Sequence, residues 1–403
     1  MGKSTFFTGQ PIFAQLLSLI PDQVISTAIK ATSSDKYYKK FTSYPHLVSM
    51  LYACFQKCTS LREVTTGLMA CQHKVQHLGL TYVPRRSTLA DANQGRTEDF
   101  FAQVFKKLHD HFFNVSPDSR LGRSIEDRLF LIDSTTISLF SEVMKGMGSR
   151  GVNGKKKGGV KAHMLVKATE DVPCFVMITE GTRNDKQIFK ELSLPRHSIV
   201  VFDKGYNSYA QFEKWDQESV TWVTRMSDTA SVEVQQVMEV SETQKQQGVL
   251  SDEIVVLGRP SNQNTLKITA RRITYYDAES GKTFRFITNN LTYKPATIAC
   301  IYKRRWQIEL LFKRLKQNYP LQYFLGDNEN AIKIQIWCSL ITDLLLKIIK
   351  SKTTRNWSYA NIAGMVRLHL MTYLKLSDFL NNPEKALVNY EEKNDYQLTL
   401  FKT

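Results

Sequence analysis

The chain has few cysteines and no long apolar run. Its 403 residues include only six cysteines, too few for a small disulfide-stabilised scaffold. The most apolar stretch, residues 336–346, is too short to span a bilayer and contains Asp343. The first residues also lack the pattern of a signal peptide. These absences argue against a secreted or membrane-spanning protein and predict a reduced, cytoplasmic one.

A cysteine-based metal site is also disfavoured. Cys54, Cys58, Cys71 and His73 lie near one another in the chain, but their spacing fits no common structural zinc pattern. Cys54 and Cys58 are separated by one helical turn and flanked by apolar residues, which favours buried thiols over metal ligands. A zinc site is the weaker alternative here.

Acidic residues are scarce relative to basic ones. The chain has 54 Lys and Arg against 38 Asp and Glu, which gives a formal net charge of +16. An excess of this size favours a polyanionic partner, either nucleic acid or an anionic membrane surface. The hydrophobic content of 42% is that of a globular protein. Because no membrane segment is present, nucleic acid is the preferred partner.

Hydrophobic patterning divides the chain into regions of different secondary structure. Residues 10–115 carry apolar side chains at helical spacing, whereas strand-like runs begin near residue 125 and recur to residue 290. Helical patterning returns at Pro295. We therefore predict an α/β fold class and three domains: a helical N-terminal DNA-binding domain (1–120), an α/β domain (121–325) with a β-rich insertion (225–292), and a helical C-terminal region (326–403). The mixed apolar faces of the C-terminal region suit either the pairing of two protomers or simple core packing.

Two arginines mark a candidate DNA-reading element in the N-terminal region. Arg85 and Arg86 follow Pro84, Ser87 can cap the helix after them, and a long amphipathic helix begins near Glu98. Short helices with basic residues at a turn are compatible with a helix-turn-helix-like reader. A helical bundle whose arginines are only solvated fits the same pattern equally well.

Two aspartates directly follow predicted buried strands. RLFLID ends at Asp133 and SIVVFD ends at Asp203. A carboxylate at the end of a strand lies at the rim of the sheet, where a rigid backbone can point it at a ligand. Either residue alone fits an ordinary turn or capping aspartate, but two of them in a basic chain favour a functional pair.

A third acid lies in the strongly basic segment YKRRWQIELLFKRLKQ, in which Glu309 is the one carboxylate among six cations. At about 100° per residue, one stripe of such a helix carries Tyr302, Arg305, Glu309, Lys313 and Lys316. The neighbouring face is apolar and can dock on a sheet. The segment predicts a helix that presents one acid and several cations to the same cleft, although an ordinary surface pair of Glu309 and Lys313 is an alternative.

These elements resemble the DDE transposases of bacterial insertion sequences, specifically the insertion-sequence-4 family with the signature Y-x2-R-x3-E-x6-K. Tyr302, Arg305, Glu309 and Lys316 match that signature, and LIDSTT and VFDKGYNSY match its two aspartate motifs. The resemblance covers most of residues 10–380. It implies an RNase H-like catalytic domain whose β-rich insertion separates the second aspartate from the glutamate, which is where the strand-rich segment lies.

The resemblance also implies a metal-dependent reaction on DNA. Asp133, Asp203 and Glu309 would be the catalytic residues and the ligands of two Mg²⁺ ions, with Mn²⁺ as a substitute. Tyr302, Arg305 and Lys316 would grip the terminal phosphate and the distorted DNA end, Arg305 by a forked contact and Tyr302 by hydrogen bonding or stacking. Lys313 would be a further DNA contact. The implied reaction is cut-and-paste transposition in four stages: nicking at the transposon end, hairpin formation, hairpin opening, and strand transfer to target DNA. A homodimer on paired ends is the implied assembly.

Several further residues are candidates for contact with DNA. The Gly- and Lys-rich loop 144–159 suits a non-specific phosphate contact, and Trp222 or Trp306 could stack on a flipped base or simply pack in the core. Weaker candidates near the motifs are Lys161, His163, Arg183 and Lys204. Two other functions stay open: a metal-dependent, structure-specific nuclease and a DNA-binding regulator without catalysis.

Overall fold

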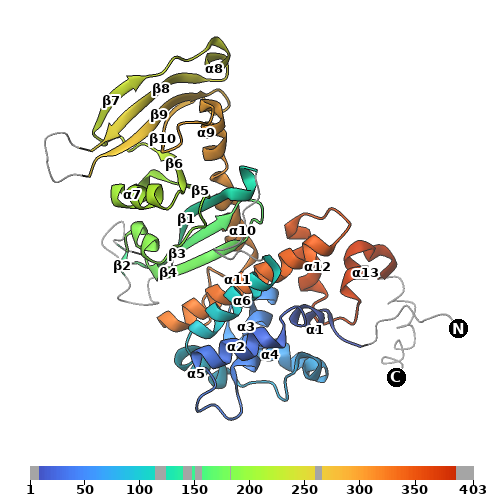
Figure 1. Cartoon of the computed structure of the whole chain (residues 1–403). Helices are drawn as coiled ribbons and strands as arrows, with labels where there is room; N and C mark the ends of the chain where they lie inside the picture. The colour runs from blue at the N-terminus through green and yellow to red at the C-terminus, as the bar shows by residue number, and fades with distance from the viewer. Residues whose placement is uncertain are drawn as a thin grey trace, which may run out of the picture. The chain divides into compact units, whose positions relative to one another are not determined.

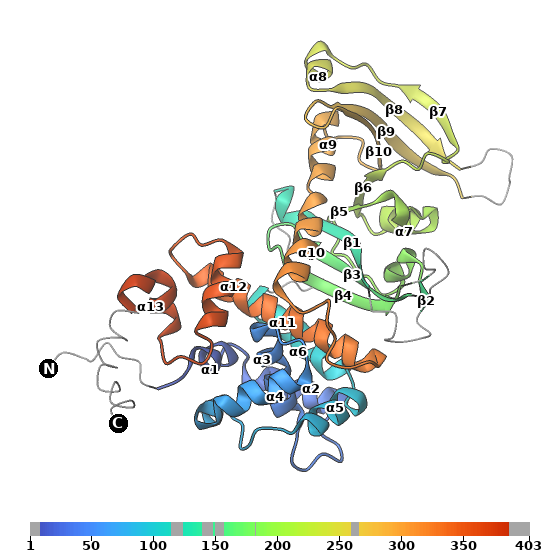
Figure 2. The same cartoon turned by 180° about the vertical axis from the view of Figure 1, so that it is seen from behind.

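The computed structural model of the chain describes residues 9–113, 124–138, 148–149, 157–181, 183–258 and 266–386. The chain forms two compact units (Figures 1 and 2). A helical unit comprises Met1–Phe112 together with Arg314–Thr403, and an α/β unit comprises Phe113–Lys313. The N-terminal and C-terminal helical regions, expected as separate domains, therefore belong to one unit.

The helical unit is built around two buried helices that contact each other, α3 (Ser43–Gln56) and α11 (Glu329–Lys352). Both are buried on most sides, so they require other helices to cover them. The covering elements are α1 (Ile12–Leu17), α2 (Asp22–Thr32), α4 (Leu61–Ala70), η1 (Gln72–Leu78), α5 (Arg86–Gly95), α6 (Asp99–Phe113), α12 (Tyr359–Leu368) and α13 (Leu376–Asn381). Because one central helix comes from each end of the chain, the two terminal regions share a single core.

The length of α11 does not make it a membrane segment. It has 24 residues, but neither it nor any other helix in the described residues combines the length and apolarity that a bilayer crossing requires. Its interior instead contains Asp343, which accepts hydrogen bonds from Arg314 at 3.1 and 3.0 Å. The side chain of Asp343 is 2% exposed, so this acid is part of the protein core.

The start of α5 differs from the sequence prediction. The helix begins at Arg86 with Arg85 as its N-cap, and no side chain caps it. Ser87 therefore lies inside the first turn and is not the cap. Arg85 and Arg86 are both exposed, so they are available to a partner of the helical unit.

A buried histidine should make the helical unit sensitive to acid. The Nε2 atom of His46 lies 2.7 Å from the Asn93 side-chain oxygen, and burial, reinforced by the nearby Arg96, lowers the pKa of His46 to about 3. The ordinary value is 6.5, so between these values the unfolded chain binds a proton that the folded chain does not. The stability contributed by neutral His46 is therefore present above pH 6.5 and is lost as the pH falls, by about 1.4 kcal/mol per pH unit.

This expectation is tested by urea unfolding at a series of pH values below 6.5. His46→Leu should reduce the slope of unfolding free energy against pH by the amount that corresponds to the uptake of about one proton on unfolding. This change in slope does not depend on the effect of the substitution on absolute stability. His73→Leu is the matched control because His73 is exposed, and it should leave the slope unchanged. A His46→Leu slope equal to that of the wild type would contradict the assignment.

The α/β unit is organised around one sheet, which has ten strands in the described residues. β1 (Leu129–Ser138) pairs in parallel with β5 (Ile199–Phe202), and β5 pairs in parallel with β6 (Thr221–Arg225). On its other side β1 is antiparallel to β3 (Lys157–Lys167). β3 in turn pairs with β4 (Pro173–Glu180) and β2 (Gly148–Ser149).

The segment expected as a β-rich insertion consists mainly of strands and continues the same sheet. β10 (Lys282–Thr288) is antiparallel to β6, and β9 (Ile268–Asp277), β8 (Val249–Leu257) and β7 (Val232–Val237) follow in that order, with the short helix α8 (Glu242–Gln246) between β7 and β8. Figures 1 and 2 show this extension of the sheet beyond β6. The insertion is thus joined to the rest of the unit by backbone hydrogen bonds.

The two faces of the central strands carry different residues. Even-numbered side chains of β1, β5 and β6, such as Phe202 and Trp222, enter a core with η4 (Asp185–Lys190) and α7 (Tyr209–Gln217). Side chains alternate along a strand, so the odd-numbered ones point to the other face. There α9 (Pro295–Lys303) contacts β5 and β6, and α10 (Trp306–Asn318) follows α9.

Candidate active site

Asp133 lies inside β1 and not at its end, which corrects the sequence prediction. The strand continues to Ser138 because β3 stays paired with it over that length. Only the pairing with β5 stops, at the partners Ile132 and Phe202. Asp133 is therefore the first residue of β1 beyond β5, and Asp203 is the first residue after β5. The two aspartates are therefore neighbours in the register of the sheet, at one rim of the parallel strands.

The helix that carries the third acid is interrupted. α9 ends at Lys303, Arg304 and Arg305 form a turn, and α10 begins at Trp306. Tyr302 and Glu309 are therefore on two successive helices, whereas the sequence predicted one. The predicted apolar face is confirmed, since five of its residues are at most 6% exposed: Ile301, Ile308, Leu311, Phe312 and Leu315.

Arg305 contacts two of the three acids at once. Its Nη1 atom donates to Asp133 Oδ2 at 2.9 Å, and its Nη2 atom donates to Glu309 Oε1 at 2.5 Å. Only 14% of the Arg305 side chain is exposed, so these pairs are shielded from water and are stronger than surface ion pairs. One guanidinium group thus holds together carboxylates that are 176 positions apart in the chain.

Asp203 has an arginine partner of its own, which the sequence analysis missed. The Nη2 atom of Arg225 donates to Asp203 Oδ1 at 2.6 Å, and the backbone amide of Gly205 donates to Oδ2 at 3.3 Å. Arg225 is the last residue of β6, and, like Asp133, it is one of the odd-numbered residues whose side chains point to the α9 face of the sheet. The sequence carries no local signal for this contact, because it depends on the pairing of β5 with β6.

Tyr302 packs between the two arginines. Its ring centroid lies 5.8 Å from the Arg225 guanidinium carbon and 5.9 Å from that of Arg305, and 4.9 Å from the ring of Phe286. The residue is 8% exposed. Tyr302 is therefore positioned to orient both guanidinium groups through cation–π contacts.

The pKa values of the two aspartates are shifted in opposite directions. Burial raises the pKa of Asp133 to about 6; the Ser134 amide and Arg305 oppose this shift, and the negative charges of Asp203 and Glu309 add to it. Burial also acts to raise the pKa of Asp203, but the hydrogen bonds from Arg225 and Gly205 outweigh it and hold that pKa below its ordinary value. Asp203 and Glu309 are thus both close enough to Asp133 for their charges to act on its carboxyl group.

The donor set suits a hard divalent cation, because Mg²⁺ prefers carboxylate oxygens. In the described part of the chain, no three His, Cys, Asp or Glu side chains are closed around a common point, and Arg305 and Arg225 bond the acids instead. Among the described residues, no hydrogen-bond partner is found for the buried Nε atoms of these two arginines. Buried polar groups are usually hydrogen-bonded, so both guanidinium groups keep a donor that the described residues do not use.

Asp185 is a fourth acid close to Asp133. It accepts hydrogen bonds from the Ser134 hydroxyl and from Lys161, each at 3.0 Å. His163, which lies 3.6 Å from the same carboxylate, is 0% exposed. Lys161 and His163 therefore serve this internal cluster, and the position of His163 does not suit the DNA contact considered from the sequence.

The other predicted DNA contacts are spread over both units. Lys313 is the last residue of the α/β unit, and Lys316 lies on α10 in the part grouped with the helical unit. Both are exposed and neither forms an ion pair with another described residue. Arg85 and Arg86 belong to the helical unit. Most of the loop 144–159 lies outside the described residues.

The two tryptophans differ sharply in exposure. Trp222 is 0% exposed, its ring is stacked on Phe212 at 4.1 Å, and its Nε1 atom donates to Asp216 at 3.0 Å. It is a core residue, as one of the two sequence interpretations had it. Trp306 is 58% exposed and stays a candidate for stacking on a base.

The transposase DDE domain family matches residues 125–342, and the domain of unknown function DUF4372 matches residues 8–81. A protein of Sinorhizobium fredii that bears the name transposase y4zB is 31% identical over 265 residues, which cover 66% of this chain and 71% of that protein. A protein of Geobacillus stearothermophilus, named as a transposase for insertion sequence element IS5377, is 24% identical over 66% of this chain and 68% of its own length. The corresponding protein for element IS4SA of Synechocystis is 27% identical over 65% of this chain and 71% of its own length.

Among solved structures, the chain is similar to the cryo-EM structure of the piggyBac transposase synaptic complex with hairpin DNA. The TM-score is 0.43 at 12% identity, over 98% of this chain and 83% of that chain. This score is too low to establish a shared fold. The family match covers more than half of the chain and includes all three acids, and the chain therefore belongs to the DDE transposases of bacterial insertion sequences, enzymes that act on DNA.

Proposed function

We propose that this transposase moves its insertion sequence by cut-and-paste transposition, with Asp133, Asp203 and Glu309 as the catalytic carboxylates. One observation carries the assignment: Arg305 contacts Asp133 and Glu309, while Asp203 lies beside Asp133 at the rim of the parallel strands. These contacts support the proposal that three acids from distant parts of the chain act together. The α/β unit is then an RNase H-like catalytic domain, which its parallel β1, β5 and β6, antiparallel β3 and helices on both faces support.

The three carboxylates would hold Mg²⁺, for which Mn²⁺ can substitute. When bound, the metal supplies neutralisation of the scissile phosphate and activation of the attacking oxygen. Asp133 must give up its carboxyl proton before it can serve as a ligand, and burial raises its pKa to about 6, so protons compete with the metal for this carboxylate near that pH. Metal binding should therefore weaken as the pH falls through that value.

The arginines have a second role when DNA arrives. A guanidinium group forms forked hydrogen bonds with phosphate as readily as with carboxylate. Arg305 and Arg225 can therefore exchange their carboxylate partners for phosphate oxygens, while Tyr302 keeps both groups oriented. In the absence of DNA, the same arginines neutralise the acids and reduce their mutual repulsion.

The finer features of the reaction rest on the signature residues. Tyr302, Arg305, Glu309 and Lys316 match the set found in hairpin-forming transposases, and a plain nuclease has no need of a grip on a hairpin. We propose that Lys313 and Lys316 hold the transposon end. We also propose that Arg85 and Arg86 contact flanking DNA and that two protomers act on paired ends, in the cytoplasm on nucleoid DNA.

The proposed function is tested with a labelled duplex that ends in the terminal inverted repeat, once sequencing of the DNA around the gene has identified that repeat. With Mg²⁺, the full chain should first nick this end and then form a hairpin, which a denaturing gel resolves from the linear strand. Chelation of the metal should remove both products. Nicking without a hairpin would refute the cut-and-paste assignment in favour of a nuclease. The absence of any cleavage would refute the proposal that this chain is catalytically active.

A further inference from the structure

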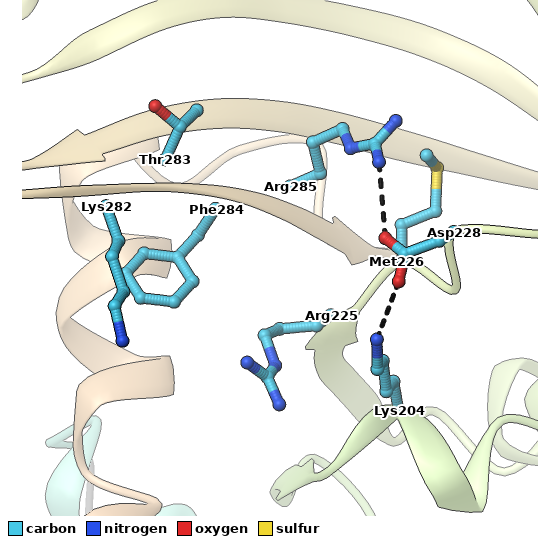
Figure 3. A pocket seen from close by; sticks show the side chains of 8 residues that line it. All are labelled: Lys204, Arg225, Met226, Asp228, Lys282, Thr283, Phe284 and Arg285. Atoms are coloured by element: carbon cyan, nitrogen blue, oxygen red, sulfur yellow. Dashed lines mark hydrogen bonds and ion pairs between the residues drawn. The ribbon is translucent and has the colours of Figure 1, made fainter.

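A basic pocket adjoins Asp203 in the α/β unit. Its volume is about 290 Å³, and it lies where β6 and β10 meet the turn after β5 (Figure 3). Half of its eight lining residues are cations, namely Lys204, Arg225, Lys282 and Arg285, and only Asp228 is acidic. The charge of this pocket is therefore predominantly positive, which suits an anionic ligand.

The sheet register brings these cations together. Phe286 of β10 pairs with Arg225 of β6, and the Met226 amide donates to the Arg285 carbonyl at 2.8 Å, so Arg285 lies next to the end of β6. Lys282 lines the pocket from the start of β10. Lys204 comes from the other side, because it directly follows Asp203. Residues from the insertion and from the central strands thus share one pocket, which periodicity along the sequence cannot predict.

The ion pairs within the pocket do not neutralise all of its cations. Asp228 accepts hydrogen bonds from Lys204 at 2.8 Å and from Arg285 at 3.3 Å, and Figure 3 shows these two cations reaching it from opposite sides. Lys282 has no ion pair with another described residue. The Nε atom of Arg225 is buried and lacks a hydrogen-bond partner, so the pocket contains a donor group that the described chain leaves unsatisfied.

We propose that this pocket binds a backbone phosphate of the DNA strand adjacent to the phosphodiester that is cut. The proposal rests on the proposed function, since Arg225 connects the pocket with the catalytic Asp203 through one 2.6 Å hydrogen bond. The pocket is open: the side chains of Lys204 and Arg285 are 42% and 47% exposed. An open pocket suits a polymer that passes across it better than a free nucleotide that must be enclosed. Asp228 competes with the phosphate for Lys204 and Arg285 and so limits the affinity.

The test measures binding of a fluorescein-labelled duplex of arbitrary sequence by anisotropy, with chelator present and over a series of salt concentrations. Lys282→Ala and Arg285→Ala should each reduce the slope of log affinity against log salt by about one. At roughly 0.15 M salt, the loss of one such contact corresponds to about a five-fold weaker affinity. Asp228→Asn should have the opposite effect and tighten binding, because it frees two cations.

The control is Lys245→Ala, which removes one positive charge from the same insertion outside the pocket. Lys245 lies on α8, its side chain is 56% exposed, and it pairs with Glu242, so its loss should leave the slope unchanged. Unfolding midpoints equal to that of the wild type would show that each variant is folded.

The outcomes separate the pocket from the proposed function. If the wild type binds the duplex but Lys282→Ala and Arg285→Ala keep its salt slope, or Asp228→Asn binds no more tightly, the pocket assignment is wrong while the proposed function stands. If the wild type binds no duplex, the proposed function itself fails. A deoxynucleoside monophosphate added at constant ionic strength should not displace the duplex; displacement would show that the pocket takes free nucleotides.

Discussion

Asp203→Asn is expected to abolish Mg²⁺-dependent nicking of transposon-end DNA while DNA binding persists. The substitution removes one of three proposed metal-ligand carboxylates but keeps the size of the side chain. A catalytic metal contributes several kcal/mol of transition-state stabilisation, so the rate of nicking should fall by about a thousand-fold or more. Because Arg225 loses its carboxylate partner, the affinity for DNA should be equal or higher.

Two measurements decide this expectation: single-turnover nicking on a denaturing gel, and anisotropy of the same labelled end without metal. Asp277→Asn is a suitable control because Asp277 is the last residue of β9 in the insertion, where it accepts hydrogen bonds from Ser280. It should nick at the wild-type rate. An Asp203→Asn variant that cuts as fast as its parent would refute the metal-ligand assignment.

Asp252→Ala should be among the most destabilising substitutions in the α/β unit. Arg271 donates to both oxygens of Asp252, from Nε at 2.8 Å and from Nη2 at 2.6 Å, and its Nη1 atom donates to the Tyr293 carbonyl at 2.6 Å. Each side chain of the Asp252–Arg271 pair is 4% exposed. Removal of the carboxylate leaves a buried guanidinium without its counter-ion, which costs about 3–5 kcal/mol.

Urea unfolding followed by circular dichroism measures this loss as a lower midpoint of the transition that reports on the sheet. Glu242→Ala is the matched control, since it removes a carboxylate from the exposed ion pair with Lys245 in the same insertion. That midpoint should not change measurably. A double variant in which Leu replaces Asp252 and Met replaces Arg271 should recover much of the lost stability; equal midpoints for Asp252→Ala and the wild type would contradict the burial argument.

Local sequence patterns predicted the elements that carry the site better than the limits of those elements. The four-residue β5 was predictable because it is fully buried and ends directly before Asp203. β1 was predicted to end at Asp133, although the residues that follow are β-branched, because its actual end depends on pairing with β3. The turn at Arg304 and Arg305 contains neither glycine nor proline, so no local signal announced a break between α9 and α10.

The contacts between distant segments were beyond the reach of the sequence patterns. Arg225 looked like an ordinary cation in a strand, and its role follows from the parallel alignment of β5 with β6. The cations of β10 reach the same pocket only because the insertion extends the existing sheet. In the helical unit, α3 and α11 pack against each other because each is too apolar to face solvent. Apolarity predicts that a helix is buried, but it does not predict which helix packs against it.

The continuity of the sheet also limits how this protein can be rebuilt. An inserted domain that is attached only by two flexible linkers can be deleted, or replaced by that of a homologue, without disturbing the domain that carries it. Here β10 forms the backbone hydrogen bonds with β6 and places Phe286 against the ring of Tyr302. Removal of β10 would therefore leave β6 as an unpaired edge strand. It would also remove a contact that holds Tyr302 against Arg225 and Arg305. Segments can therefore be exchanged between homologues only in the outer strands of the insertion, whereas β10 has to stay with the catalytic domain that it pairs with.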